Sequence, residues 1–134
     1  MGGARDLSGD WAGTYRYDHG GAPVPMDVTL TEAMGLISGT SREPNTFRRD
    51  APDELIADLD GTHTAGIVQW VKRYRDFDQG DHPVYEGQVT ADLDRIDGRW
   101  RFPRNPSWSG PFRLRRLRKA ARTRAKARET ERVQ

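Results

Sequence analysis

Alternating apolar and polar residues along the chain predict a series of short strands. The clearest case is the range 24–31, in which the even-numbered residues are Val, Met, Val and Leu while the odd-numbered ones are Pro, Asp and two Thr. A period of two is typical of a strand with one buried face, so we expect the even-numbered side chains to face a core. Eight such strands are predicted, in the ranges 10–18, 24–31, 36–40, 55–59, 64–75, 84–91, 95–102 and 108–116.

A glycine recurs inside these strands, two positions after an apolar residue. The repeats are Leu7-Ser8-Gly9, Ile37-Ser38-Gly39, Leu59-Asp60-Gly61, Tyr85-Glu86-Gly87, Ile96-Asp97-Gly98 and Trp108-Ser109-Gly110. A glycine within a strand marks a bulge, a bend or a close approach of two backbones. We therefore expect successive strands that turn the corners of a small barrel. Residues 60–62 are expected to form a turn.

The spacing of the strands predicts the architecture. Short strands joined by turns rich in Gly, Pro and Asp, without helical crossovers, favour an all-β fold, an eight-stranded antiparallel up-and-down barrel. The longest interruption is the polar segment 41–52, which we expect to be a loop, either over the barrel mouth or extending into solvent. Residues 1–115 are assigned to the barrel. Residues 116–134, rich in Ala, Arg and Lys without Gly or Pro, predict a basic tail that is helical or disordered.

With the strands in place, the chain resembles the calycin group of barrels, which includes lipocalins, fatty-acid-binding proteins and avidins. Gly9-Asp10-Trp11 is similar to the Gly-x-Trp of their first strand, whose Trp closes the barrel floor. The order Trp70, Tyr74-Arg75, Tyr85-Glu86-Gly87, Ile96 and Trp100 looks like the middle of avidin-type chains, where aromatic residues wall the ligand pocket. The resemblance implies a lumen that binds a small molecule. Residues 81–83 are Asp, His and Pro where avidin-type chains have hydroxyl residues, and no Asp follows Trp108, so biotin binding is not implied.

Composition limits the protein class. A chain of 134 residues has room for one domain. Its hydrophobic content is 34% and its mean hydropathy is −0.89, which suits strands with one charged face. No apolar run reaches the length of a membrane span, the first residues lack a signal-peptide pattern, and there is no cysteine. We therefore expect a cytoplasmic protein without disulfides or thiolate sites.

Charge is divided unevenly along the chain. Residues 1–112 carry 12 Lys and Arg against 18 Asp and Glu, a net charge of −6, whereas residues 113–134 carry 10 against 2, a net charge of +8. Such a basic run binds anionic partners non-specifically, improves solubility, or docks on the acidic barrel of its own chain. The predicted basic patch consists of Arg113, Arg115, Arg116, Arg118, Lys119 and Arg122.

Aromatic residues are the candidates for a ligand site, because small-molecule pockets are mostly apolar. We predict that Tyr15, Trp70, Tyr85 and Trp100 wall a lumenal pocket; the alternative is that these rings fill the barrel. Trp11 is assigned to the core. Glu86 is a candidate acid or base if its side chain is buried in the lumen, since burial raises a carboxyl pKa; the alternative is an exposed position on a strand.

Motifs for cofactors and metals are not found in the sequence. There is no phosphate-binding or dinucleotide-binding motif, the three histidines are isolated, and the acidic segment 76–81 does not match a calcium loop. We therefore expect no cofactor and no metal. The leading prediction is non-enzymatic binding of a small, partly apolar ligand in the lumen. The alternatives are a protein- or nucleic-acid-interaction module with a filled barrel and a basic tail, and a small barrel enzyme of the cyclase or isomerase type that uses Glu86.

Overall fold

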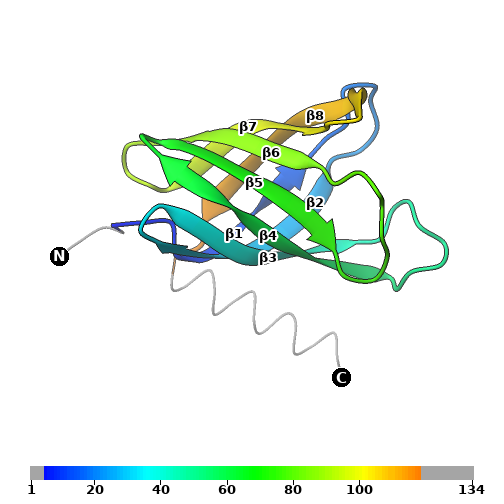
Figure 1. Ribbon diagram of the computed structural model, residues 1–134, viewed down its shortest axis with the longest axis horizontal. Coiled ribbons are helices and arrows are strands. Elements are labelled where there is room, and N and C mark those ends of the chain that lie inside the picture. The colour runs from blue at the N-terminus through cyan, green and yellow to red at the C-terminus, as the bar shows by residue number, and fades with distance from the viewer. Residues whose placement is uncertain (1–4, 119–134) are drawn as a thin grey trace.

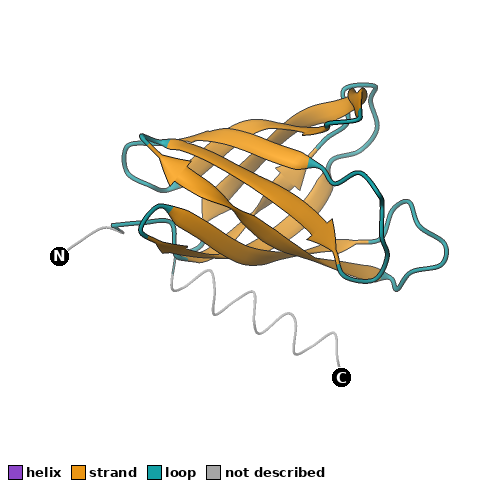
Figure 2. Ribbon diagram, viewed as in Figure 1, coloured by secondary structure: helices purple, strands orange, loops and turns teal. Residues whose placement is uncertain are grey.

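The computed structural model describes residues 5–118 and shows a closed barrel of eight antiparallel strands (Figures 1 and 2). Each strand pairs with the next along the chain, and the last pairs with the first, as in an up-and-down barrel. The strands are β1 (Gly9–Tyr15), β2 (Val24–Ala33), β3 (Leu36–Pro44), β4 (Glu54–Thr64), β5 (Ile67–Tyr74), β6 (Val84–Val89), β7 (Arg95–Phe102) and β8 (Asn105–Arg116). The predicted barrel is confirmed. Of the basic tail predicted at 116–134, as helical or disordered, Arg116 belongs to β8 and residues 119–134 lie outside the described residues.

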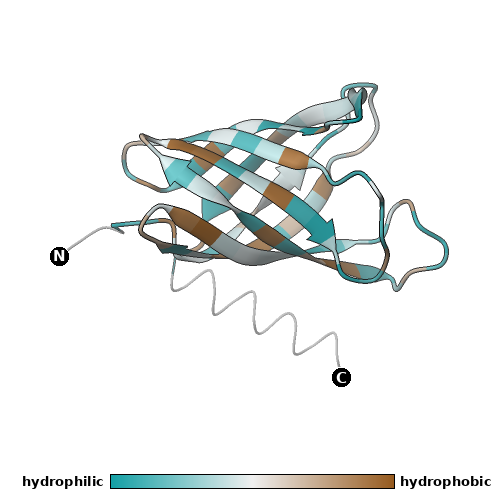
Figure 3. Cartoon of the chain, in the orientation of Figure 1, coloured by the Kyte–Doolittle hydropathy of each residue, from teal (hydrophilic) through white to brown (hydrophobic). Residues whose placement is uncertain are grey.

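The inward face of each strand is set by the period-two pattern. In β2 the even-numbered residues from Val24 to Leu30 are buried and the odd-numbered ones between them are exposed, as predicted from the alternation of apolar and polar residues. Figure 3 shows the resulting bands of apolar and polar residues along the strands. Because a slip of one residue would turn the apolar face outward, this pattern also fixes the register of each pair.

β3 and β4 differ most from the prediction. β3 continues to Pro44, so the loop after it covers residues 45–53 rather than 41–52. β4 runs through Gly61 to Thr64, and the turn predicted at 60–62 lies instead at Ala65 and Gly66, where both residues have a positive φ. The cause at β3 is that Glu43 pairs with a lysine inside the barrel, so polar side chains do not mark the end of the strand.

Gly61 lies where β4 and β5 approach too closely for a side chain. A Cβ atom at this position would come within 1.7 Å of the carbonyl oxygen of Gln69. Gly13 in β1 is equally restricted, since its Cβ would come within 1.7 Å of the carbonyl oxygen of Arg113 in β8. At both positions the close backbone approach expected for glycine within a strand is present.

One end of the barrel is sealed around Trp11. The indole Nε1 donates a hydrogen bond of 2.9 Å to the carbonyl oxygen of Leu7, and both side chains are fully buried. The Arg116 guanidinium lies 4.6 Å from the centroid of the Trp11 ring and donates to the backbone oxygens of Ser8 and Asp6 at 2.8 and 2.6 Å. The N-terminal segment is thereby held across this end, and Trp11 belongs to the core as predicted.

The other end carries the longer connections. The loops β1–β2, β3–β4 and β5–β6 and the short β7–β8 turn gather there, while the hairpins β2–β3, β4–β5 and β6–β7 lie at the sealed end (Figure 1). Because the opposite end is sealed, any lumenal site must open between the longer loops.

Within residues 5–118 there is no helix of the length and apolar character needed to cross a membrane.

Candidate ligand-binding site

A cavity of about 500 Å³ lies at the loop end of the barrel. Its wall is mainly aromatic, with a few polar side chains contributed by the loops and by the first residues of β8. The aromatic side chains that line it are Tyr15, Tyr17, Phe47, Tyr74, Tyr85, Trp100, Phe102 and Trp108. An apolar concavity with a small number of polar groups is the usual form of a small-molecule site.

The strands direct the innermost rings into the lumen. Tyr15 ends β1, Tyr74 ends β5 and Tyr85 lies near the start of β6, each at an inward position of its strand. Trp100 of β7 is fixed by a hydrogen bond of 2.8 Å from its Nε1 to the carbonyl oxygen of Arg16. Its ring meets the Tyr15 ring edge to face, with centroids 5.8 Å apart. The inner wall of the cavity is therefore held by contacts between neighbouring strands.

Beneath this wall lies a buried ion pair between Glu43 of β3 and Lys72 of β5. The two side chains are almost completely excluded from solvent, with residue exposures of 2% and 1%. The Lys72 ammonium donates to Glu43 Oε1, Tyr74 donates to the same oxygen at 3.0 Å, and Tyr15 donates to Oε2 at 2.5 Å. Several hydrogen bonds thus compensate the carboxylate for the loss of water, as a buried charge requires.

Three tyrosine rings surround the Lys72 ammonium. Its Nζ lies 4.8 Å from the ring centroid of Tyr15, 4.9 Å from that of Tyr74 and 5.4 Å from that of Tyr85. Nζ also donates a long hydrogen bond of 3.4 Å to the Tyr85 hydroxyl. Aromatic faces attract a cation most strongly when water is excluded. The lysine is therefore stabilised by its surroundings as well as by Glu43.

Burial shifts the acidity of this cluster. Desolvation raises the pKa of Tyr15, Tyr74 and Tyr85, and the nearby Glu43 charge raises it further. Desolvation also lowers the pKa of Lys72, while the Glu43 carboxylate acts in the opposite direction. In each case burial disfavours the charged form. The three phenols are consequently held as neutral hydroxyl groups that can donate and accept hydrogen bonds.

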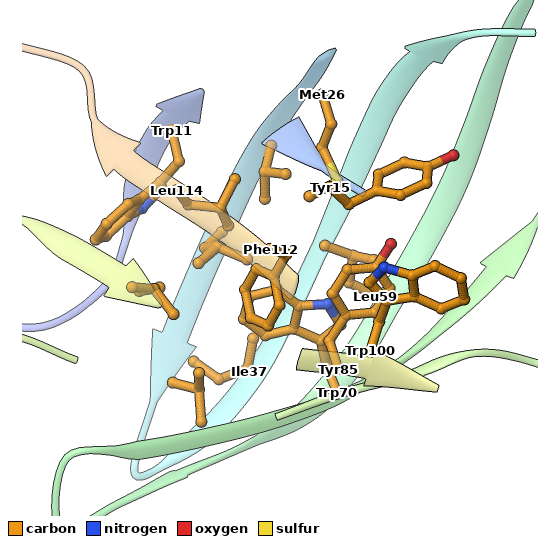
Figure 4. Packing of buried hydrophobic residues seen from close by; sticks show 14 of the residues in the cluster. Trp11, Tyr15, Met26, Ile37, Leu59, Trp70, Tyr85, Trp100, Phe112 and Leu114 are labelled. Atoms are coloured by element: carbon orange, nitrogen blue, oxygen red, sulfur yellow. The ribbon is translucent and has the colours of Figure 1, made fainter. Parts of the chain in front are cut away.

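Three of the four predicted pocket-wall residues line the cavity. Tyr15, Tyr85 and Trp100 do so, whereas Trp70 lies deeper in the core. The Trp70 ring stacks on Tyr85 with centroids 6.0 Å apart and packs against Phe112 at 5.8 Å. Figure 4 shows these rings grouped together and Trp11 apart from them. Trp70 therefore supports the wall from behind, and ligand binding by the other three stays a prediction.

Glu86 does not meet the condition set for an acid or base in the lumen. Its side chain is exposed on the outer face of β6, where it lines a groove shared with Arg99 of β7. The reason is the register of β6, in which Tyr85 and Gly87 take the inward positions. The lumenal carboxylate is Glu43 instead.

Sequence reasoning missed both Glu43 and Lys72. Extending the odd-numbered face of β3 from Ile37 through Ser41 would have placed Glu43 inside the barrel. Lys72 follows Val68 and Trp70 at the same parity in β5, but apolar residues on both faces of that segment hid its register. One acidic and one basic residue on inward positions of different strands is the signal that indicates such a pair.

The predicted basic patch is partly used within the fold. Arg113 pairs with Asp97 at 2.6 Å, Arg118 lies 3.7 Å from Asp94, and Arg116 covers Trp11 at the sealed end. Arg115 is exposed on β8. Lys119 and Arg122 lie outside the described residues, and binding of an anionic partner stays a prediction. In the described range, no three His, Asp or Glu residues are arranged to hold a metal ion.

Comparison with known proteins adds no assignment. No protein-family model matches the chain, and no curated protein sequence matches it significantly. The cavity is therefore interpreted from its own geometry and chemistry.

Proposed function

We propose that this protein binds a small, partly apolar molecule in the cavity at the loop end of its barrel, without catalysing a reaction. The observation that carries the proposal is the cavity of about 500 Å³, walled by aromatic rings. Beneath it, Glu43 and Lys72 anchor the tyrosine hydroxyls. Apolar walls supply most of the affinity of such a site, and a few fixed polar groups orient the ligand.

The position of the charged pair favours binding over catalysis. Glu43 and Lys72 lie behind Tyr15, Tyr74 and Tyr85 and are not part of the cavity wall. A general acid or base must come within hydrogen-bond reach of its substrate. A ligand in the cavity meets the phenols first, so the buried pair serves to position those hydroxyls.

The calycin resemblance belongs to the same proposal. Its support is the arrangement of the two ends: Trp11 closes the floor of the barrel, and the aromatic cavity lies at the opposite end. Asp81 and Pro83 line the cavity in the segment where avidin-type chains have hydroxyl residues. We therefore propose a calycin-like binding barrel whose ligand is not biotin.

Intrinsic tryptophan fluorescence tests the proposal, because Trp100 and Trp108 line the cavity. A library of aromatic small molecules should include compounds that quench the fluorescence saturably with one site per chain. Trp108→Ala removes a rim side chain that is 45% exposed and should weaken binding about tenfold. Leu36→Ala is the matched control, because this exposed apolar side chain lies at the sealed end, and it should leave affinity unchanged.

Two results would contradict the proposal. One is a complete lack of saturable quenching across the library, as expected for a barrel that acts only as an interaction module. The other is an equal loss of affinity in Trp108→Ala and Leu36→Ala, since such a result would place binding away from the cavity.

A further inference from the structure

The hydrogen-bond polarity of the tyrosines is set by the buried pair. A carboxylate only accepts hydrogen bonds, so Tyr15 and Tyr74 must donate their hydroxyl protons to Glu43. Tyr85 has the opposite role, because its oxygen accepts from Lys72.

Two hydrogen-bonding groups of cavity-lining residues consequently have no partner within residues 5–118. The Tyr85 hydroxyl proton has no acceptor in the range 5–118, while its ring lines the cavity. The side-chain carbonyl oxygen of Gln79 also belongs to a cavity-lining residue and is buried without a hydrogen-bond partner in that range. One donor and one acceptor without a partner, both uncharged, therefore belong to residues that line the cavity.

The cationic groups near the cavity are already paired. Lys72 is neutralised by Glu43 and enclosed by three tyrosine rings. Arg48, the one cationic side chain among the described lining residues, pairs with Asp50 at 2.7 Å, and its guanidinium lies 4.3 Å from the ring centroid of Phe77. The lining also includes the carboxylate of Asp81. A negatively charged ligand would therefore lose water without gaining a counter-charge.

We infer that the cavity selects uncharged aromatic molecules that carry both a hydrogen-bond donor and an acceptor, such as aromatic amides and lactams, and rejects the corresponding carboxylates. The inference rests on the proposed function and names the chemical class of its ligand. A ligand that lacks the matching donor or acceptor leaves the polar groups of the site without hydrogen bonds. Such a site therefore discriminates between ligands more strongly than an apolar wall does.

A matched pair of probes tests this selectivity. 2-Naphthamide and 2-naphthoate have the same ring system and nearly the same shape but differ in charge at neutral pH. Isothermal titration calorimetry with the full chain should give an affinity for the amide that is about tenfold or more above that for the acid. Tyr85→Phe deletes the unpartnered donor together with the acceptor of the long Lys72 hydrogen bond, and should weaken amide binding about tenfold.

Two further variants separate the polar groups. Tyr74→Phe is the matched control, because its hydroxyl proton is already donated to Glu43, and the amide should keep its advantage over the acid. Glu43→Gln leaves the hydroxyls of Tyr15 and Tyr74 with one carbonyl acceptor between them, so a phenol proton becomes available to 2-naphthoate and the advantage of the amide should shrink. Circular dichroism checks that each variant is folded. If Glu43→Gln does not fold, the comparison of Tyr85→Phe with Tyr74→Phe still tests whether the Tyr85 hydroxyl proton selects the amide.

The outcomes distinguish this inference from the proposed function. Equal or tighter binding of 2-naphthoate to the unmodified protein would overturn the selectivity, as would equal amide losses in Tyr85→Phe and Tyr74→Phe. If library compounds bind in the cavity but the amide gains nothing over the acid, only the selectivity fails. If neither probe and no library compound binds, the proposed function fails as well.

Discussion

At the scale of single residues, the unusual feature of this barrel is a complete ion pair inside a small lumen. Glu43 and Lys72 are each compensated by several contacts, and neither reaches solvent. Burying two charges is costly, so a pair of this kind adds little net stability compared with an apolar pair of similar volume. It does fix the orientation of the hydroxyls around it, which is the property that a ligand site needs.

Removing one partner of the pair should therefore cost far more than removing both. Lys72→Met leaves the Glu43 carboxylate without its counter-charge and should lower the free energy of unfolding by about 3–5 kcal/mol. The double variant Glu43→Gln/Lys72→Met has no buried charge and should recover most of that loss. Urea denaturation of the three proteins measures both changes. Equal destabilisation by the single and double variants would contradict a charge-compensated pair.

The aromatic residues were easier to predict than the charges. Tyr15, Tyr85 and Trp100 follow from the rule that large rings on a strand turn inward. The same rule does not give depth along the barrel axis, which is why Trp70 was assigned to the cavity wall although it lies in the core. Glu43 was assigned to a loop because isolated charged residues are seldom buried, and only its distant partner on another strand reverses that expectation.

At the scale of elements, periodicity predicted all eight strands and their order around the barrel. β7 (Arg95–Phe102) has the predicted bounds, because turn residues flank a clean alternation. The error in β4 falls where a turn residue serves another purpose. Gly61 was interpreted as a turn in the sequence Asp60-Gly61-Thr62, yet it lies within β4. A single strand does not show how closely its neighbour packs, and that distance is what requires glycine here.

Gly61→Ala should accordingly destabilise the barrel. The new methyl carbon would meet the Gln69 carbonyl oxygen at 1.7 Å and the Trp70 Cα at 2.6 Å, so β4 and β5 must separate. We expect a loss of about 3 kcal/mol in the free energy of unfolding, at the upper end for an overpacked site. Gly80→Ala is the control: nothing lies within 4 Å, and only its φ of +75° opposes a side chain. That variant should lose about 1 kcal/mol.

Thermal or urea unfolding of the two variants provides the measurement. Near-equal losses in Gly61→Ala and Gly80→Ala would show that contact between the strands is not what demands glycine at position 61. The comparison is matched because both substitutions add the same methyl group.

At the scale of the whole molecule, the barrel divides its tasks between two ends. The sealed end is held by Trp11, Arg116 and Leu7, and its contacts are those of a rigid closure. The loop end places the aromatic cavity over the buried pair. Because the strands connect both ends, the closed end restrains the barrel while the loops shape the site.

This concentration of phenols in one lumen gives the whole molecule a characteristic response to alkaline pH. All four tyrosines of the chain, Tyr15, Tyr17, Tyr74 and Tyr85, have a pKa raised above the ordinary value of 10.0, with burial as the largest cause. Above that pH the unfolded chain loses phenolic protons that the folded protein keeps. The free energy of unfolding must therefore fall as pH rises.

The same tyrosines set how steeply the free energy of unfolding falls with pH. Each tyrosine that stays protonated contributes about 1.4 kcal/mol per pH unit above pH 10, so Tyr15, Tyr74 and Tyr85 together give about 4 kcal/mol per unit. Lys72 acts with the opposite sign, because its lowered pKa means that the folded protein releases that proton before the unfolded chain does. This opposing effect ends above the ordinary lysine pKa of 10.5, where both states have lost the proton, so the net effect is a loss of stability.

Urea denaturation midpoints from about pH 8 to pH 11.5, together with tyrosinate absorbance at 295 nm, measure this response. In the folded protein the absorbance should not rise near pH 10; it should appear only as circular dichroism reports unfolding. Tyr15→Phe should flatten the decline by roughly one phenol, about 1.4 kcal/mol per unit. A tyrosinate titration near pH 10 in protein that is still folded would mean that water reaches these hydroxyls. The tyrosine hydroxyls around Glu43 and Lys72 would then not be the water-excluded polar groups that selective ligand binding requires.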